Sequence, residues 1–474
     1  MEQPLTYLQQ RAGENWLIGY DSNQLYCLTE ALFIQFTQLQ ATPAKILIAE
    51  PHPLRFLAAF LAAVAADCHI FLCNPHWGEQ ESQQVFELVQ PDLIWGQGGR
   101  EAEEQRSRGA GEAQSAISIQ HSALIMIPTG GSSGKIRFAI HTWETLTASV
   151  RGVHHFFGEK PINSFCILPL YHVSGLMQFL RSFLTGGSLF LLPYKALKTG
   201  ERGNIDPSQY FISLVPTQLQ HLLTSNGSEW LSRFHTVLLG GAPAWQELLE
   251  TARSHHIRLA PTYGMTETAS QIVTLKPEYF LAGNNSSGQI LPHASVAICS
   301  ATGEFLGKNQ TGIITIQSDS LCLGYYPEYV ANLQYFQTDD LGFLNTNSYL
   351  HLVGRRSQKI ITGGENVFPN EVEAAILATQ LVTDVCVIGL PNPYWGEVVT
   401  AVYVPKHSEV SQAALKIQIE DKLSRFKQPQ YWVEVKSLPR NAQGKINYEK
   451  LPRIAMDSLN SPFSSLSATV KLPQ

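Results

Sequence analysis

The chain has 474 residues, whereas a typical domain has roughly 100–200, so we expect several compact units. Hydrophobic residues make up 44% of the chain and charged residues 15%, which provides for a large core and excludes an intrinsically disordered protein. The 33 Lys and Arg residues against 39 Asp and Glu residues give a net charge of -6, which disfavours wholesale binding of nucleic acid. A local basic site for one phosphate compound is compatible with this composition.

The cysteines and the apolar runs indicate a reducing compartment and no membrane span. Seven cysteines are scattered without CxxC spacing, which predicts free, buried thiols rather than a disulfide framework or a zinc site. The first ten residues lack a basic segment followed by an apolar stretch, so we expect no signal peptide. The longest apolar run, 56–66, is shorter than the roughly 18 residues of a membrane-spanning helix and predicts a buried helix. We therefore expect a cytoplasmic protein.

Strand-like and helical segments alternate along the first half of the chain. The predicted strands cover residues 46–49, 69–73, 93–95, 123–127, 165–168, 188–192, 210–215 and 236–239. Helices are expected at 53–66 and 84–89, and a polar surface loop at 99–115. The order strand, helix, strand implies parallel strands joined by crossover connections, so we expect an α/β fold.

From residue 287 to about 352 the pattern changes to strand-like runs separated by turn residues, which favours an antiparallel, barrel-like β subdomain. Helical patterns return at 369–378 and 412–426, before a Ser-rich tail at 457–474 that we expect to be loose. The predicted domains are a large N-terminal one at 1–356 and a small, mobile α+β one at 357–474.

An apolar strand runs into a loop of glycine and hydroxyl residues at 129–137, where Lys135 and Arg137 add positive charge. Glycines let backbone N–H groups approach an anion closely, and hydroxyls and cations complete its shell. The loop is not a Walker A motif, because that motif needs a glycine where this chain has Thr129. Taken alone, the segment is equally compatible with an ordinary flexible loop.

Five further motifs follow the loop in order. They are PTYGMTET at 261–268, TDDLG at 338–342, GR at 354–355, GGENVFPNEVE at 363–373 and PRNAQGKI at 439–446. In this order and rough spacing the set resembles the adenylate-forming superfamily of acyl-CoA synthetases, luciferases and peptide-synthetase adenylation domains. The resemblance extends over most of the chain, from about residue 40 to 452.

The resemblance implies an ATP-dependent ligase that uses Mg²⁺ and coenzyme A. A carboxylate attacks the α-phosphate of ATP, giving an acyl-adenylate and pyrophosphate, and a thiol then displaces AMP. Because the first step brings anions together, cations and oriented donors have to offset their charge. The ATP-binding residues implied are Thr129, Gly131, Ser132, Ser133, Gly134, Lys135, Arg137, Gly240, Gly241, Ala242, Tyr263, Gly264, Asp340 and Arg355.

The phosphate loop departs from the usual family string TSGTTGxPKG. Gly130 replaces a serine and Arg137 stands at the usual lysine position, so positive charge is retained and Lys135 can share the role. Thr266 and Glu267 match the family pair that contacts the α-phosphate and binds Mg²⁺, an ion that prefers oxygen ligands. The alternative for this pair is a helix N-cap threonine with a first-turn glutamate.

The resemblance also assigns contacts to the base and the sugar of the nucleotide. Tyr263 is expected to stack on adenine, Asp340 to accept hydrogen bonds from both ribose hydroxyls, and Arg355 to contact the ribose and help with phosphate charge. The segment 240–242 matches the family loop that lines the adenine pocket. Taken singly, Asp340 and Arg355 are equally compatible with surface charges.

Lys445 matches the family lysine that bridges the carboxylate and the α-phosphate during adenylation, which makes it the principal catalytic candidate. Its flexible stem and compact charge suit a group that reaches in from another domain, whereas an isolated Gly-Lys pair would favour a solvated turn. The C-terminal domain would rotate between the half-reactions about a hinge at Gln358, where the family usually has a charged residue. It would thereby complete a pantetheine tunnel lined by Gly363 and Gly364.

The remaining strings concern the acid. The predicted acyl contacts are His172, which we also count as catalytic, and Ser174, Arg181, Thr217, Ser270, Gln271 and Thr274. YGMTETASQIVT at 263–274 is most similar to the 2-succinylbenzoate–CoA ligases of menaquinone and phylloquinone synthesis. That acid carries a second carboxylate and a ketone, so its pocket needs polar donors, and a fatty acid would leave them unpaired at about 1–3 kcal/mol each. A core histidine at His172 and a surface arginine at Arg181 are the alternatives.

Other hypotheses stay open. The chain could be a CoA ligase for another aryl or short-chain acid, such as benzoate or malonate, or for a medium-chain acid. It could be a stand-alone amino-acid-adenylating domain, although the aspartate such domains place early in the pocket has no equivalent near 213–217. It could also be a non-catalytic nucleotide-binding protein on the same fold. The expected partners are a carboxylic acid, ATP and CoA, with no nucleic acid, and the oligomeric state is open.

Overall fold

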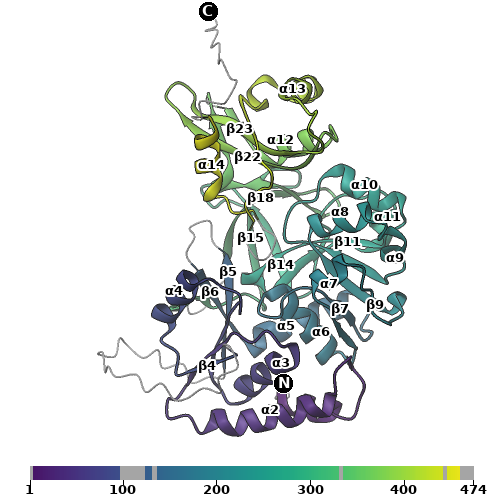
Figure 1. Ribbon diagram of the computed structural model, residues 1–474, viewed down its shortest axis with the longest axis vertical. Coiled ribbons are helices and arrows are strands. Elements are labelled where there is room, and N and C mark those ends of the chain that lie inside the picture. Colours follow the sequence, from purple (N-terminus) through teal and green to yellow (C-terminus); the bar gives the residue numbers. More distant parts are fainter. Residues whose placement is uncertain are drawn as a thin grey trace, which may run out of the picture.

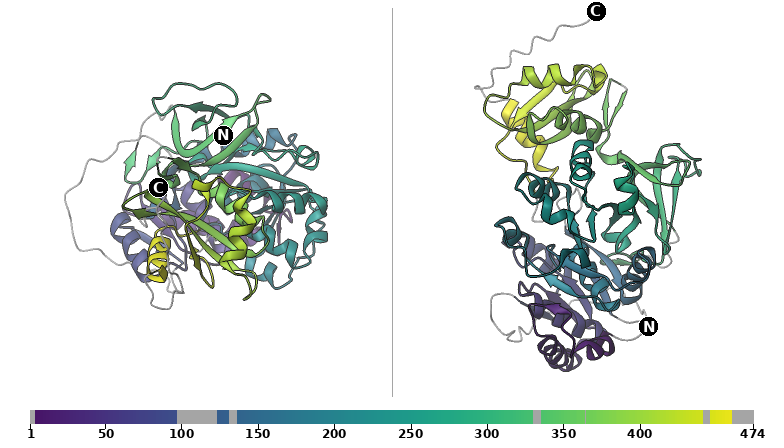
Figure 2. Two further views of the ribbon diagram at one scale, coloured as in Figure 1. Left: turned by 90° about the horizontal axis from the view of Figure 1, so that it is seen from above. Right: turned by 90° about the vertical axis from the view of Figure 1, so that its right-hand side faces the viewer.

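The structure is a computed structural model that describes residues 4–96, 123–130, 136–329, 335–363, 365–440 and 446–459. The described residues form four β-sheets with flanking helices, of which the C-terminal sheet (β22, Val382–Asn392, and β23, Gly396–Pro405) lies at one end of the long axis (Figure 1). The N-terminus and the C-terminal elements lie at opposite ends, as the side view in Figure 2 shows. The α/β fold class predicted from the sequence is confirmed.

The first sheet has seven strands in the order β17-β16-β6-β5-β3-β2-β4. They are β2 (Lys45–Ile48), β3 (His69–Leu72), β4 (Leu93–Trp95), β5 (Leu124–Gly130), β6 (Ile136–Thr142), β16 (Gly324–Tyr325) and β17 (Glu328–Tyr329). Strands β2 to β5 are parallel, as predicted, and β5 turns back into the antiparallel β6. Alternating residues of β2 face different cores, so α3 (Pro53–Ala65) and α4 (Glu79–Val89) cover opposite faces.

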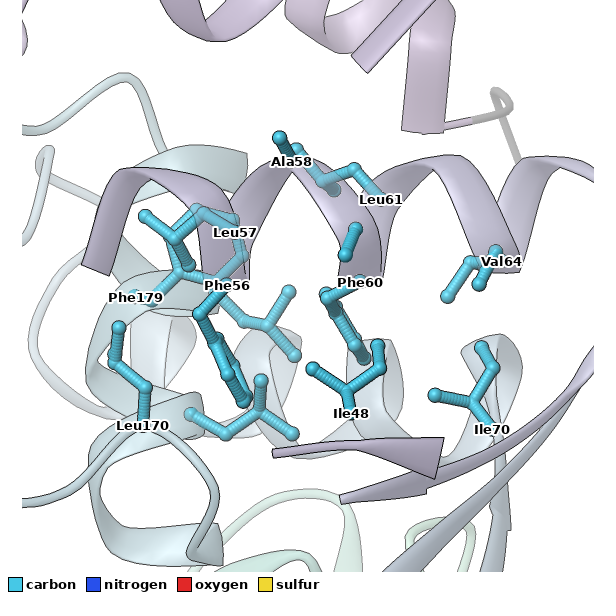
Figure 3. Close-up of a cluster of buried hydrophobic side chains, with 14 of the residues drawn as sticks. Ile48, Phe56, Leu57, Ala58, Phe60, Leu61, Val64, Ile70, Leu170 and Phe179 are labelled. Atoms are coloured by element: carbon cyan, nitrogen blue, oxygen red, sulfur yellow. The ribbon is translucent and has the colours of Figure 1, made fainter. Parts of the chain in front are cut away.

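Apart from Arg55 in its first turn, helix α3 is apolar on every side, as the sequence predicts for a buried helix. Pro53 lies in its first turn, where the missing N–H costs no hydrogen bond. Figure 3 shows Phe60 beside Ile48 of the first sheet and Phe56 beside Leu170, which precedes helix α6 (Val173–Leu184). Helix α3 therefore lies between the first sheet and the segment that leads into helix α6.

The second sheet has eight strands in the order β1-β8-β7-β9-β10-β11-β12-β13. They are β1 (Leu17–Ile18), β7 (Asn163–Cys166), β8 (Leu189–Leu191), β9 (Tyr210–Leu214), β10 (Thr236–Leu239), β11 (Leu259–Met265), β12 (Ser270–Thr274) and β13 (Gln289–Ile290). The strands from β1 to β11 are parallel, and β12 and β13 turn back antiparallel. The other helices of this part are α1 (Pro4–Arg11), α2 (Ser22–Thr37), α5 (Trp143–Phe156), α7 (Tyr194–Lys198), η1 (Pro207–Gln209), α8 (Pro216–Thr224), α9 (Ser228–Ser232), α10 (Gln246–Ser254) and α11 (Pro277–Leu281).

Helix α6 is closed at its carboxyl end by an arginine from the first helix. The guanidinium of Arg11 is buried and donates hydrogen bonds of 2.8–3.0 Å to three carbonyl oxygens, those of Ser182, Phe183 and Gly187. Carbonyls at the end of a helix have no partner within the helix, so an external donor stabilises them. The N-terminal helix α1 therefore fixes the end of α6.

The third sheet is antiparallel, as predicted for this part of the chain. Its strands are β14 (Ala294–Cys299), β15 (Gly312–Ser318), β18 (Phe336–Leu344) and β19 (Leu350–Arg355), in this order. The outer strands β14 and β19 do not pair with each other among the described residues, so the sheet is open in place of the barrel-like unit expected. The register of β18 and β19 sets Asp340 opposite Arg355.

The C-terminal elements form a five-stranded sheet with cores of their own. They are β20 (Ile360–Thr362), β21 (Glu365–Val367), α12 (Pro369–Leu377), β22 (Val382–Asn392), β23 (Gly396–Pro405), α13 (Gln412–Glu420), η4 (Arg425–Lys427), β24 (Tyr431–Glu434) and α14 (Lys450–Leu459). Helix α13 ends at Glu420 rather than at Phe426, whereas α14 includes the start of the predicted tail. The rest of that tail lies outside the described residues, and the domain division at residue 356 stays a prediction.

All seven cysteines lie in the described residues and are free, six of them buried as predicted and Cys27 exposed. Across the described ranges, no helix combines the length and the apolar character needed to cross a membrane. The polar loop predicted at 99–115 falls outside the described residues.

Candidate active site

Glu267 lies where the first and second sheets meet. It belongs to the short helix η2 (Thr266–Thr268) between β11 and β12, and only 8% of it is exposed. Its Oε1 accepts a hydrogen bond of 2.7 Å from the hydroxyl of Tyr325 and a longer one of 3.4 Å from the hydroxyl of Thr129, near the end of β5. The structure thus brings together two residues that the sequence assigns to the nucleotide, from positions far apart in the chain.

Arg137 lies on the strand that leaves the phosphate loop. In the register of β5 and β6 it stands opposite Thr129, and its guanidinium carbon is 4.5 Å from the centre of the Tyr325 ring. The hairpin of β5 and β6 therefore places a hydroxyl and a cation at the base of the predicted loop. The remaining loop residues assigned to ATP lie outside the described residues: Gly131, Ser132, Ser133, Gly134 and Lys135.

A buried histidine fixes the backbone at Thr266. Nε2 of His141, on β6, lies 2.8 Å from the carbonyl oxygen of Thr266, and Nδ1 lies 3.0 Å from the hydroxyl of Thr145. Because a carbonyl only accepts, Nε2 must carry the proton and Nδ1 accepts. Burial lowers the pKa of His141 from 6.5 to about 4, so the ring is neutral at neutral pH.

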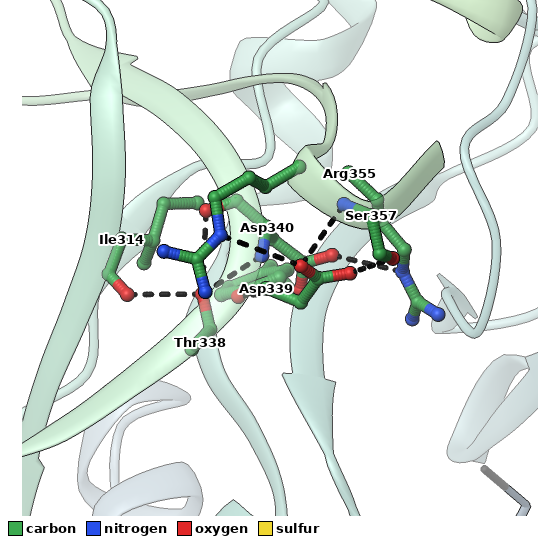
Figure 4. A network of polar contacts seen from close by, with 8 residues as sticks. Ile314, Thr338, Asp339, Asp340, Arg355 and Ser357 are labelled. Carbon is green, nitrogen blue, oxygen red and sulfur yellow. Dashed lines mark hydrogen bonds and ion pairs between the residues drawn. The ribbon is translucent and has the colours of Figure 1, made fainter. Parts of the chain in front are cut away.

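Three residues predicted for the base and the sugar form one polar group. The hydroxyl of Tyr263 donates to Oδ2 of Asp340 at 2.9 Å, and Nε of Arg355 donates to Oδ1 at 3.0 Å. Figure 4 shows the pairing of Arg355 with Asp340 and the hydrogen bonds from Ser357 to the neighbouring Asp339. Burial, followed by the charge of Asp340, raises the pKa of Tyr263 well above its ordinary value, so its hydroxyl remains a donor.

Two of the glycines predicted to bind the nucleotide occupy positions that require glycine. Gly241, in the predicted adenine loop of Gly240, Gly241 and Ala242 after β10, has φ +81, a conformation that side chains with a Cβ rarely adopt. A Cβ on Gly264 would lie 2.0 Å from the carbonyl oxygen of Ser270, so only glycine fits between β11 and β12 there. Both positions therefore need glycine for reasons that the fold supplies.

Arg181 is a buried cation on α6. Only 3% of the residue is exposed, and Nη2 donates to Oγ of Ser270 at 3.0 Å and to Oε1 of Gln271 at 2.9 Å. Within the described residues, Nε has no hydrogen-bond partner and no carboxylate forms an ion pair with the guanidinium. Burial lowers the pKa of Arg181 to about 10, which still leaves it charged at neutral pH. The site therefore holds a positive charge that the described protein groups do not neutralise.

Other buried polar atoms on the same helix and on strand β12, together with His293, also have no partner in the described structure. Among the described residues, buried atoms without hydrogen bonds include Ser182 Oγ, Gln271 Nε2, Thr274 Oγ1 and both ring nitrogens of His293. Burial, with the charge of Arg181 contributing, lowers the pKa of His293 to about 4. Ser270 has φ +91, which is strained for a residue with a side chain and which turns it towards Arg181. Unpaired buried groups are costly, so this cluster is suited to a polar ligand.

The other predicted acyl contacts lie at the starts of helices. His172 is the N-cap residue of α6, is 8% exposed and has its ring 4.6 Å from that of Tyr171. Ser174 lies in the first turn of α6, and Thr217 lies in the first turn of α8, directly after β9. Their contacts with an acid stay predictions.

The C-terminal candidates are described in part. Gln358 ends the short helix η3 (Arg356–Gln358) after β19, and Gly363 follows β20 with φ +58. A Cβ on Gly363 would lie 2.8 Å from the ring of Trp395. Gly364 and Lys445 lie outside the described residues. The residues that flank the lysine segment are paired, because Arg440 and Ile446 form an isolated β-bridge.

Sequence reasoning missed three residues of this site. His141, Tyr325 and His293 stand singly in the chain, and each becomes informative only through a neighbour distant in sequence. Of these three, only Tyr325 has a local signal in the sequence, because it follows Gly324 in the short strand β16, to which no motif assigns a role.

A profile of the AMP-binding enzyme family matches residues 24–326, and a profile of the AMP-binding enzyme C-terminal domain matches residues 371–445. The chain belongs to the AMP-binding enzyme family. The superfamily resemblance drawn from the ordered motifs is therefore confirmed.

Several proteins similar to this chain are named as ligases or synthetases that act on 2-succinylbenzoate. The 2-succinylbenzoate–CoA ligase of Listeria monocytogenes is 33% identical over 343 residues, 70% of each chain. That of Geobacillus kaustophilus is 35% identical over 298 residues, 60% of each chain. The o-succinylbenzoate CoA synthetase of Bacillus subtilis, solved in complex with the acyl-adenylate intermediate OSB-AMP, superposes with a TM-score of 0.80 at 25% identity and covers 94% of this chain and 97% of its own.

Proposed function

We propose that the chain is an AMP-forming acid–thiol ligase that activates 2-succinylbenzoate with ATP and transfers the acyl group to coenzyme A. The product would be 2-succinylbenzoyl-CoA for menaquinone or phylloquinone biosynthesis. Membership of the AMP-binding enzyme family supports the reaction, and the relatives named 2-succinylbenzoate–CoA ligase support the acid. The cytoplasmic location expected from the sequence belongs to the same proposal.

The uncompensated charge of Arg181 is the observation that carries the choice of acid. 2-Succinylbenzoate has two carboxylates, of which one reacts and the other keeps its negative charge. A buried guanidinium with an unpartnered Nε, beside the amide of Gln271, can pair with that second carboxylate. Benzoate and fatty acids have no second charge and would leave Arg181 buried and unpaired, which is strongly unfavourable.

In the first half-reaction, an oxygen of the reacting carboxylate bonds to the α-phosphorus of ATP and the bond to pyrophosphate breaks. Thr129 and Arg137, at the base of the hairpin, would receive the leaving phosphates. Glu267 offers one carboxylate, and no group of three metal-binding side chains occurs in the described part of the chain. One carboxylate together with nucleotide phosphates is a usual environment for Mg²⁺, so these residues fit the ion. When bound, Mg²⁺ would supply positive charge to the phosphates.

The ribose would be held by Asp340. An ionised carboxylate can accept about four hydrogen bonds, and two of these sites are already taken by Tyr263 and Arg355. The remaining sites can accept the two ribose hydroxyls. The protein contacts orient the carboxylate before the nucleotide arrives, which lowers the cost of ordering it on binding.

In the second half-reaction, the thiol sulfur of coenzyme A bonds to the acyl carbon and AMP leaves. Lys445 would bridge the carboxylate and the α-phosphate in the first step and withdraw in the second, as the C-terminal domain turns about Gln358. Gly363 and Gly364 would line the path of the pantetheine. The aromatic rings of Trp395 and Phe426, 6.5 Å apart and next to Gly363, add an apolar surface along this path.

The proposal is tested by pyrophosphate release and thioester formation with a panel of acids. The panel holds 2-succinylbenzoate, benzoate, malonate, octanoate and mixed amino acids, each with ATP, Mg²⁺ and CoA. We expect turnover with 2-succinylbenzoate and a kcat/KM at least about 100-fold below it for benzoate and octanoate, which lack the second charge. Equal or better turnover of malonate would move the proposal to another dicarboxylic acid, and turnover of octanoate alone would refute it.

A further inference from the structure

Tyr325 touches both charged groups at the base of the phosphate loop. Its hydroxyl donates to Oε1 of Glu267 at 2.7 Å, and the guanidinium of Arg137 lies over its ring at 4.5 Å from the centre. Its backbone pairs with Ala139 on β6, the strand that also holds Arg137. The ring is therefore fixed between the anion and the cation.

These opposite charges form no ion pair with each other in the described structure. At this short range, an unobstructed guanidinium and a carboxylate attract strongly, and a direct pair would satisfy both. The phenol satisfies each side separately, with the face of its ring towards Arg137 and its O–H towards Glu267.

We propose that Tyr325 is a positioning residue that keeps Arg137 and Glu267 apart, so that the cation stays available to phosphate and the carboxylate to Mg²⁺. The inference rests on the proposed use of MgATP and is independent of which acid is activated. Without the ring, Arg137 and Glu267 would neutralise each other, and the site would lose both functions together.

The way Glu267 is hydrogen-bonded supports this role. Both of its side-chain hydrogen bonds reach Oε1, and Oε2 accepts none among the described residues. The phenol therefore orients the carboxylate and leaves one oxygen for the metal ion. Burial, followed by the charge of Glu267, raises the pKa of Tyr325, so the phenol remains a donor throughout the neutral range.

The test separates the hydroxyl from the ring. Tyr325→Phe keeps the ring over Arg137 but removes the donor to Glu267, whereas Tyr325→Leu removes both. Tyr326→Phe is the matched control, because Tyr326 packs its ring on Phe71 and its hydroxyl bonds nothing in the described structure. Glu267→Gln gives the ATP affinity expected when Mg²⁺ no longer strengthens binding.

The affinity for ATP is measured on the full chain by calorimetry, once with EDTA and once with saturating Mg²⁺, and with no acid present. We expect Tyr325→Phe to bind ATP normally in EDTA. The increase in ATP affinity on adding Mg²⁺ should be about tenfold smaller than in the wild type. In Tyr325→Leu, binding in EDTA should weaken as well, because Arg137 pairs with Glu267. Thermal unfolding of each variant establishes that it is folded.

Three outcomes overturn the inference. One is a Tyr325→Leu variant that binds ATP in EDTA as tightly as the wild type, and another is a Tyr325→Phe variant whose gain from Mg²⁺ equals that of the wild type and of Tyr326→Phe. The third is a wild type that binds no ATP, which would overturn the proposed function as well. A wild type that binds MgATP but activates a different acid changes the proposed substrate only, and the result for Tyr325 then stands by itself.

Discussion

Arg181 and Gln271 lie 2.9 Å apart, from guanidinium Nη2 to amide Oε1, and join helix α6 to strand β12. Strand β12 begins one residue after the helix that contains Glu267, so residues proposed to bind the acid and the nucleotide lie on one short stretch of backbone. An acid held by Arg181 would therefore be placed by the same segment that places the carboxylate for the metal ion.

Replacing Arg181 tests acid recognition. We expect Arg181→Met to raise the KM for 2-succinylbenzoate by roughly 10- to 100-fold and to leave the KM for ATP unchanged, because a charge-assisted contact is lost. The melting temperature of the ligand-free protein should not fall, since an uncompensated buried charge is removed with its hydrogen bonds. Arg181→Lys retains the charge but not the paired donors of the guanidinium, so its KM for the acid should lie between those of the wild type and Arg181→Met. An unchanged KM for the acid in Arg181→Met would contradict the assignment.

Asp340→Asn tests the ribose contact by steady-state kinetics. The amide offers one oxygen in place of two, so we expect the KM for ATP to rise by about tenfold or more, with the KM for the acid unchanged. Asp339→Asn is the control, because the side chain of Asp339 bonds Ser357 instead. Equal effects of the two variants on ATP would refute a specific role for Asp340.

Lys445→Ala separates the half-reactions. Adenylation, followed as pyrophosphate release, should slow by at least about 100-fold, because a charge that stabilises the transition state is removed. Thioester formation from supplied acyl-adenylate should continue, since the lysine is proposed to act in the first step only. The exposed Lys436 gives a control substitution in the same region of the chain. Unchanged adenylation in Lys445→Ala would remove Lys445 from the mechanism.

His141 predicts a dependence of stability on pH. Its pKa is about 4 in the folded protein and 6.5 in the unfolded chain, so only the unfolded chain takes up the proton as the pH falls from 6.5 towards 4. This linkage removes about 2 kcal/mol of unfolding free energy between pH 7 and pH 5. His141→Gln keeps a donor for the Thr266 carbonyl but does not titrate.

Urea unfolding at pH 7 and pH 5 measures this contribution. We expect His141→Gln to lose about 2 kcal/mol less than the wild type over that interval, because the other histidines contribute equally to both proteins. An identical loss in the two proteins would mean that His141 is not held neutral by burial.

The alternating pattern of the chain was sufficient to predict most of the framework. The apolar run in α3 and the short strands around it were found because burial on both faces produces continuous apolar segments. The predicted limits of two helices, α13 and α14, differ from those in the structure. Leu415, Ile419 and Leu423 keep helical spacing and are buried, but α13 ends at Glu420 and a turn delivers Leu423 to the core. Helix α14 has buried Leu451 and Ala455 at helical spacing, and it extends into the Ser-rich segment from residue 457 that the sequence predicts to be a loose tail.

The site was predictable where it rests on local strings and not where it rests on tertiary contact. Thr266, Glu267 and Asp340 stand in recognisable motifs, and the structure places Glu267 beside Thr129. Tyr325 and His141 have no such string, because their roles depend on partners 58 and 125 positions away. Residues of this kind are defined by the packing of whole sheets, which no local spacing encodes.

The hydrogen bonds from Arg11 connect the first helix of the chain to the helix that carries the proposed acid-binding residue Arg181. They clamp the end of the helix on which Arg181 stands, although Arg11 lies far from any motif. A truncation that removes residues 1–11 would spare every assigned residue and still remove the donors that hold the end of that helix. For the same reason a fusion partner is better attached after residue 459, where no element of the described fold would be disturbed.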